Sequence, residues 1–187
     1  MTDDVDIIKG CIREDRASQD KLYDAYASTM YGLCLRYSSN RDEAKDVLQD
    51  GFIKVFKSIG KFKNQGSLEG WIKRIMVNTA LDQYHKRQKE FNHASFDDIN
   101  ELNIETVEAS VQYEGEFSEN ELMAMIQDLP RGYQLVFNLF AIEEYSHKQI
   151  AEMLNISEST SKTQFFKARS LLQKKIIELQ RKNVLAI

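Results

Sequence analysis

The side chains whose spacing most suggests chemistry lie near residue 48. Asp46, Gln49 and Asp50 fall within two turns of a stretch in which apolar residues recur at helical spacing. Residues three and four apart are neighbours on a helix, so the three side chains are expected to share one face. Carboxylates and an amide on such a face are either solvated or available to the donors of a partner.

A divalent-metal site is the enzymatic interpretation of the same region. Its ligands would be five carboxylates: Asp42, Glu43, Asp46, Asp50 and Asp82. A catalytic site needs ligands that converge on a pocket, and one helix face beside solvent does not supply that convergence. Cys11 and Cys34 lie in apolar surroundings without a CxxC pair, so both are expected to be core thiols rather than zinc ligands. We predict no catalytic residue, no metal and no cofactor, and a protein that is not an enzyme.

A second chemically suggestive pattern lies near the C-terminus. Ser146 and Gln149 form a capping box that opens a helix of about eight residues. The chain then turns at 155–157, and a longer basic helix runs from near Glu158 to about Gln180. This order is typical of a helix-turn-helix, whose second helix enters the major groove of DNA.

The long helix has an apolar face and a polar one. Phe165, Ala168 and Leu172 are expected to pack inward. The candidates for DNA contact lie on or near the other face: Ser159, Lys162, Thr163, Phe166, Lys167 and Arg169. Lys and Arg can bind phosphate or guanine, and an aromatic ring can pack on a thymine methyl. His147 and His85 are expected to be surface residues.

Helices must position both groups of side chains. The chain has 187 residues with one Pro, 8 Gly, 42% hydrophobic and 29% charged residues, which favours a soluble, mostly helical protein. Apolar spacing predicts helices near 7–11, over 22–37 and over 41–58, a polar loop at 60–67, and a fourth helix from Ser67 to about Lys89. Trp71 shares the register of Leu68 and Ile72 and is expected in the core. A capping box at Ser118 opens a helix that Pro130 stops, and a further helix covers 133–140.

Charge divides the chain into three segments. Residues 1–90 carry 16 basic and 14 acidic side chains. Residues 91–129 carry no basic and 10 acidic side chains, and residues 130–187 carry 9 basic and 5 acidic ones. An acidic segment with few large apolar residues cannot bury enough surface to order itself. We predict an all-α protein with two small helical domains, 1–91 and 118–187, joined by a flexible acidic linker over 92–117.

The residues from Arg41 to Phe56, with the pattern Asp46-x-x-Gln49-Asp50, resemble region 2 of bacterial sigma factors. The segments 62–68 and 71–75, with Asn78, Ala80 and Asp82, resemble the −10 segment that follows in that family. The resemblance implies that Asp46, Gln49 and Asp50 bind the clamp helices of the RNA polymerase core. It also implies that the following segment melts promoter DNA and holds a flipped base.

The chemistry of the residues is compatible with that implied role. Basic side chains can follow the phosphates of a separated strand, and short polar side chains can receive an unstacked base. The implied −10 contacts are Lys63, Asn64, Gln65, Ser67, Lys73, Arg74, Asn78, Lys86 and Arg87.

The segments 129–137, 146–154 and 159–169 resemble region 4 of the extracytoplasmic-function (ECF) sigma factors, which reads the −35 element. Three positions depart from the family pattern. Tyr145 stands where Gly is usual, Ser161 where a buried Val is common, and Gln164 where Arg is common. We expect Ser161 to cost packing and Gln164 to remove one positive charge near DNA.

Together the two resemblances imply a minimal, two-domain ECF sigma factor that directs RNA polymerase core to specific promoters. The implied partners are the polymerase core, promoter DNA and an anti-sigma protein. The alternative is a free-standing helix-turn-helix regulator that binds DNA without polymerase. No apolar run approaches the ~18 residues of a membrane span and the first residues are acidic, so we expect a cytoplasmic protein without membrane insertion.

Overall fold

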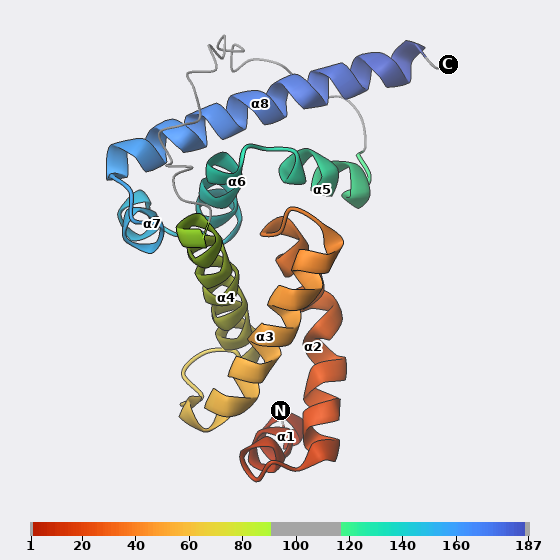
Figure 1. Ribbon diagram of the computed structural model, residues 1–187. Helices are drawn as coiled ribbons and strands as arrows, with labels where there is room; N and C mark the ends of the chain where they lie inside the picture. The colour runs from red at the N-terminus through yellow and green to blue at the C-terminus, as the bar shows by residue number, and fades with distance from the viewer. Residues whose placement is uncertain (1, 91–116, 186–187) are drawn as a thin grey trace. The chain divides into compact units, whose positions relative to one another are not determined.

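The computed structural model describes residues 2–90 and 117–185, and every element in those ranges is a helix, as predicted. The chain divides into two compact units, residues 1–87 and 88–187. In Figure 1 the described helices run from red to green in the first unit and end in blue in the second. The predicted linker, 92–117, lies outside the described residues apart from Phe117. Its flexibility and the domain bounds 1–91 and 118–187 therefore stay predictions.

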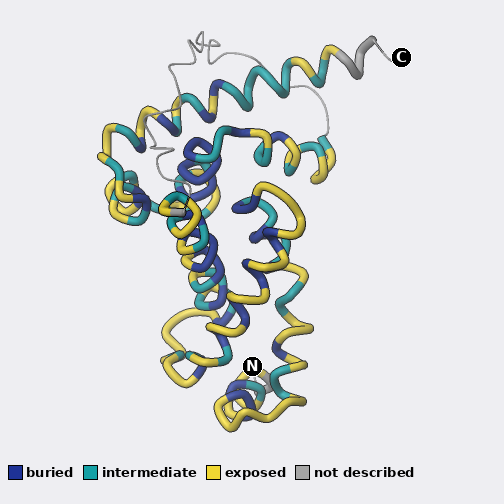
Figure 2. The backbone as a smooth tube through the Cα atoms, in the orientation of Figure 1, coloured by how far each residue is buried: buried dark blue, intermediate teal, exposed yellow. Residues whose placement is uncertain are grey.

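The N-terminal unit contains α1 (Thr2–Ile12), α2 (Arg16–Arg36), α3 (Arg41–Ser58), the short η1 (Ile59–Lys61) and α4 (Leu68–Glu90). The start of α3 is capped, since the Asn40 side chain accepts a hydrogen bond from the Glu43 amide at 2.8 Å. Such a cap satisfies one of the amide groups left unpaired at a helix start. The core is built from one face of each helix (Figure 2), and its largest members include Leu22, Met30, Leu33, Tyr37, Ile59, Ile72 and Met76.

Helices α3 and α4 pack closely at Gly51. Gly51 is buried, and a Cβ at this position would collide with the Sδ of Met76, which is itself fully buried. The absence of a side chain therefore lets the two helices approach. Cys11 and Cys34 are buried free thiols, as predicted.

The prediction that Trp71 belongs to the core is wrong. Its neighbours Leu68 and Ile72 are buried, but Trp71 is half-buried and packs on Phe62, with 5.6 Å between ring centroids. The contact joins the first residue of the preceding loop, Phe62, which directly follows η1, to the first turn of α4.

The C-terminal unit contains α5 (Glu119–Gln127), α6 (Arg131–Phe137), a π-helical turn η2 (Asn138–Ile142), α7 (His147–Leu154) and α8 (Glu158–Leu185). Both predicted capping boxes, at Ser118 and Ser146, are present. Leu129, Tyr133 and Ala168 form a buried cluster on which Phe137, Leu171 and Leu172 pack. The inward face predicted for the long helix is thus confirmed.

Several helix bounds differ from the predictions: α1 and α2 begin earlier, at Thr2 and Arg16, and the largest differences in the C-terminal unit concern two helices. The helix predicted over 133–140 changes at Asn138 from α to π, and the Glu143 amide donates to the Asn138 carbonyl, five residues earlier, at 3.0 Å. Buried Asn138 also donates its side-chain amide to the Gln134 carbonyl at 3.0 Å. Helix α8 continues to Leu185, five residues beyond the predicted end near Gln180. An ion pair between Lys175 and Asp128, at 2.9 Å, joins its second half to the end of α5.

Candidate functional site

The polar face of α3 is open to solvent. Asp46, Gln49 and Asp50 are all exposed, whereas Val47 and Phe52 on the other side of the helix are buried. The three side chains therefore share an exposed face, as their spacing predicts. Sequence reasoning missed Ile53, which continues this face one turn later and is 43% exposed. Ile53 therefore adds an exposed apolar group to the carboxylates of this face.

Helix α4 contributes polar groups beside this face. The Gln83 side-chain amide donates to Asp50 Oδ2 at 3.0 Å, and Lys54 pairs with Asp82 at 2.8 Å. The Gln83 contact orients the Asp50 carboxylate while leaving it exposed. Among the residues that the structure describes, no group of three or more His, Cys, Asp or Glu side chains could hold a metal ion.

The loop between η1 and α4 presents short polar side chains. Lys63, Asn64 and Gln65 are exposed, and the backbone of Asn64 and Gly66 is left-handed, with φ of 53° and 100°. Asn and Gly are the residues that adopt this conformation most readily, so the sequence favours the tight loop seen here. The Ser67 hydroxyl accepts from the Gly70 amide at 3.0 Å and so caps α4.

The basic residues of α4 differ in their partners. Arg74, Asn78 and Lys86 are exposed. Lys73 pairs with Glu69 on the same helix, with 3.1 Å between the charged atoms. The structure thus places the implied −10 residues on one loop and the helix that follows it.

Arg87 makes a contact that could not be predicted from the sequence. Its Nη1 lies 2.9 Å from Oε2 of Glu43, whose side chain is only 3% exposed. The same Glu43 oxygen accepts from the Ser39 amide at 2.8 Å. Arg87 therefore neutralises a buried carboxylate at the start of α3, a second role beside the implied DNA contact.

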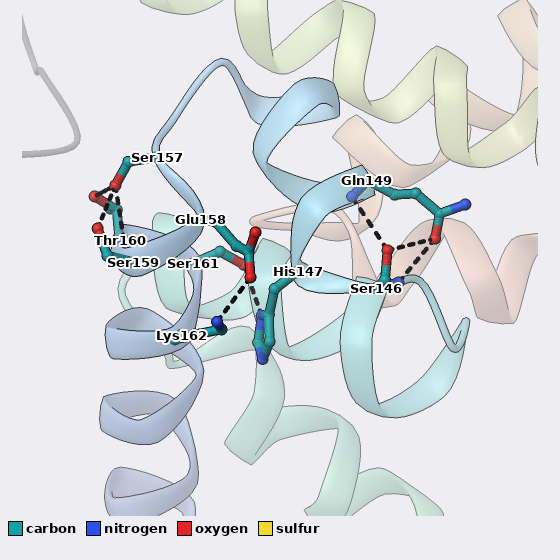
Figure 3. A network of polar contacts seen from close by, with 9 residues as sticks. All are labelled: Ser146, His147, Gln149, Ser157, Glu158, Ser159, Thr160, Ser161 and Lys162. Carbon is teal, nitrogen blue, oxygen red and sulfur yellow. Dashed lines mark hydrogen bonds and ion pairs between the residues drawn. The ribbon is translucent and has the colours of Figure 1, made fainter.

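The helix-turn-helix is formed by α7, a turn and α8. Asn155 ends α7 in the left-handed conformation, with φ 55° and ψ 47°, which any residue other than Gly or Asn adopts at a cost. The Ser157 hydroxyl then accepts from the Thr160 amide at 2.9 Å and caps α8 (Figure 3). The predicted turn at 155–157 is confirmed.

The candidate DNA-reading side chains cluster at the start of α8. Ser159, Lys162, Thr163, Phe166 and Arg169 are exposed and Lys167 is half-exposed. Phe166 is 52% exposed, so its ring is accessible to a partner. Lys162 pairs with Glu158 at 2.7 Å, and this hydrogen bond holds the pKa of the Glu158 carboxyl below its usual value.

The expectations for Gln164 and His147 are wrong. Gln164 is buried, so it does not stand in place of a charge that faces DNA. Ser161 is fully buried, but its hydroxyl is hydrogen-bonded to Nδ1 of His147 at 2.9 Å. His147 is consequently a half-buried residue that joins α7 to α8 rather than a surface histidine, while His85 is half-buried beside Tyr84.

Comparison with known proteins matches both units. A family model described as Sigma-70 region 2 matches residues 22–90, and one described as Sigma-70, region 4 matches residues 119–172. The chain is 27% identical over 183 residues to the ECF RNA polymerase sigma factor SigW of Bacillus subtilis, covering 92% of this chain and 96% of the relative. It is 28% identical over 169 residues to the ECF RNA polymerase sigma-E factor of Haemophilus influenzae, covering 87% and 89%.

A solved structure supports the fold. The sigma factor RpoE of Bartonella quintana, crystallised with the anti-sigma factor NepR, superposes with a TM-score of 0.51 at 20% identity and covers 84% of this chain and 95% of that one. In the part of the chain that the structure describes, none of the helices has the length and apolar character needed to cross a membrane.

Proposed function

The chain belongs to the ECF group of the sigma-70 family, and from this premise we propose that it directs RNA polymerase core to specific promoters and initiates transcription there. The observation that carries the proposal is the pair of matched regions, 22–90 and 119–172, each on its own helical unit of one chain. A promoter has two separate elements, and a protein with two DNA-binding units can contact both.

We assign core binding to Asp46, Gln49 and Asp50 of α3. Their support is exposure on one face, and Ile53 extends that face with an apolar group. Complementary charges steer association, while a buried apolar contact in the centre of an interface supplies affinity. The clamp helices of the polymerase core are the proposed partner.

We assign −10 recognition to the loop before α4 and to α4 itself. The loop offers exposed Lys63, Asn64 and Gln65 beside the half-buried Trp71. Extruding a base from a duplex costs a few kcal/mol, and short polar groups beside an aromatic ring can recover part of that cost. The basic side chains Lys73, Arg74, Lys86 and Arg87, with Asn78, would follow the phosphates of the opened strand, and Ser67 would set the shape of the loop.

We assign −35 recognition to the first turns of α8. Lys162, Thr163 and Phe166 are exposed where a recognition helix meets base edges, and Arg169 lies one turn further along. Ser159 and Lys167 complete the surface. We also propose an anti-sigma protein as a partner, a cytoplasmic location beside the polymerase, and a role without catalysis of its own.

Run-off transcription with purified core polymerase tests the proposal. Core alone should give no specific transcript from a library of candidate promoters, whereas core with this chain should give discrete transcripts that share two sequence elements. A chain that fails to bind core, or binds it without yielding a specific transcript, would contradict the proposal. Sequence-specific DNA binding without core would instead support the free-standing regulator, which the match of residues 22–90 to region 2 does not favour.

A further inference from the structure

His147 lies where three elements of the C-terminal unit meet. It is the first residue of α7, and its ring stacks on Phe140 of η2 with 4.2 Å between centroids and an interplanar angle of 10°. Phe140 in turn contacts Phe165 of α8, with 4.5 Å between centroids. The imidazole is therefore held in a defined orientation by aromatic packing, which favours offset or tilted rings at such distances.

The same ring makes a polar contact to the recognition helix. Its Nδ1 lies 2.9 Å from the Oγ of Ser161, across the turn between α7 and α8 (Figure 3). Ser161 is fully buried, so its hydroxyl needs a partner within the protein. A polar pair thus occupies a place in the helix-turn-helix that apolar side chains would otherwise fill.

Ser161 stands between the candidate DNA-reading residues. Ser159 precedes it by two positions, and Lys162 and Thr163 follow it directly on the same turn. A change in how this turn lies against α7 would redirect all three side chains. Recognition groups must be held within about 0.5 Å of their productive positions, and the side chains behind them do the holding.

We propose that His147 is a positioning residue for −35 recognition, which through its contact with Ser161 fixes the first turn of α8 relative to α7. The inference rests on the proposed function, because it assigns His147 a part in reading the −35 element. His147 itself touches no DNA in this scheme.

Protonation of His147 should weaken the arrangement. Burial lowers the pKa of His147 below its usual value, and Lys162 lowers it further, while Glu158 opposes both. Lys148, on α7, acts in turn on Glu158. When the pKa of a histidine is lower in the folded protein than in the unfolded chain, the fold is most stable at pH values above the unfolded pKa, about 6.5. That stability is lost as the pH falls below about 6.5. The −35 contact should therefore weaken in mild acid.

The test measures promoter affinity of the holoenzyme formed from core polymerase and the full chain. The holoenzyme made with each variant is titrated onto two DNA duplexes, one with an intact −35 element and one without it. The ratio of the two affinities is the −35-dependent component of promoter binding. The variants are His147→Phe, which keeps a stacking ring but removes Nδ1, Ser161→Ala, and the double variant. His85→Phe is the matched control, because it removes a half-buried imidazole from the other unit.

Each single variant should reduce the −35-dependent component by about fivefold, because it leaves the other polar group of the pair without its partner. The double variant should recover to within about twofold of the unmodified chain, because neither polar group remains. Between about pH 7.5 and about pH 6 the component should fall for the unmodified chain and for His85→Phe, and stay flat for His147→Phe.

Single variants that match the unmodified chain, or whose effects simply add in the double variant, would overturn the inference. So would a His147→Phe profile that parallels the unmodified one. If a single variant loses its helical circular dichroism, the folded double variant decides: near-normal −35 affinity with a flat pH profile supports the inference, and any other result overturns it. An unmodified holoenzyme with no −35 dependence contradicts the proposed function itself, which distinguishes that failure from failure of the inference.

Discussion

Arg87→Ala should destabilise the N-terminal unit by about 2 kcal/mol, because it removes a charged hydrogen-bond donor from a buried carboxylate. The Glu43 side chain is 3% exposed, and Arg87 Nη1 lies 2.9 Å from its Oε2. A hydrogen bond between charged groups contributes about 1.5–3 kcal/mol. Since Arg87 is 46% exposed, water screens the pair, and we expect the lower part of that range.

Lys73→Ala is the matched control. It also removes a cation of α4 from an ion pair, but Lys73 and its partner Glu69 are 41% and 45% exposed. An exposed pair at this helical spacing contributes about 0.3–0.5 kcal/mol. The comparison therefore separates the burial of the carboxylate from the loss of a positive charge.

Tryptophan fluorescence gives a selective assay. Trp71 is the one Trp of the chain and packs on Phe62 within the N-terminal unit, so its emission reports the unfolding of that unit alone. With a urea dependence of about 1–2 kcal/mol per molar for a unit of this size, Arg87→Ala should lower the unfolding midpoint by about 1–2 M. In a Glu43→Gln background, the same change should cost much less. Equal losses for Arg87→Ala and Lys73→Ala would refute the reasoning and leave Arg87 as a DNA contact alone.

Three further outcomes are expected. Asp50→Lys should weaken core binding by about tenfold or more, because like charges then meet at the interface. Fluorescence anisotropy measures the affinity and circular dichroism should show an unchanged fold; unchanged affinity contradicts the assignment. Phe166→Ala should change preference at one promoter position by about 1–3 kcal/mol, whereas Arg169→Ala should weaken all sequences alike in a selection assay; identical profiles would argue against base contact by Phe166. Gly51→Ala should lower unfolding free energy by about 1 kcal/mol because its methyl group collides with α4, whereas Gly32→Ala, with open space around its Cβ, should raise it by up to about 1 kcal/mol; a stabilising Gly51→Ala would contradict the packing described.

Local features of this protein could be predicted from its sequence. The caps at Asn40, Ser118 and Ser146 each bond within three residues, so neighbouring sequence contains both partners. Exposure of Asp46, Gln49 and Asp50 follows from the period of one helix, which places apolar residues on the opposite side.

Contacts between distant residues could not be predicted in the same way. Glu43 has the spacing of a capping residue, but it is buried and pairs with Arg87, which lies on another helix. Gln164 is polar but faces inward, because its position on α8 is set by the packing of that helix and not by its own side chain. Ser161 was the one sequence feature that pointed to the inward contact of His147. A polar residue at a buried position requires a partner, but the sequence does not identify that partner.

The burial of both cysteines has a practical consequence for measuring how the two units move. Burial raises the pKa of the Cys34 thiol to about 12 and raises the pKa of Cys11, where Asp15 adds to the effect. Because the thiolate is the nucleophile, only on the order of 10⁻⁵ of Cys34 is reactive at neutral pH. One cysteine introduced on the surface of each unit could therefore carry a fluorescent dye without removal of the native thiols. The distance between the units could then be followed as the chain passes from free solution onto polymerase and promoter.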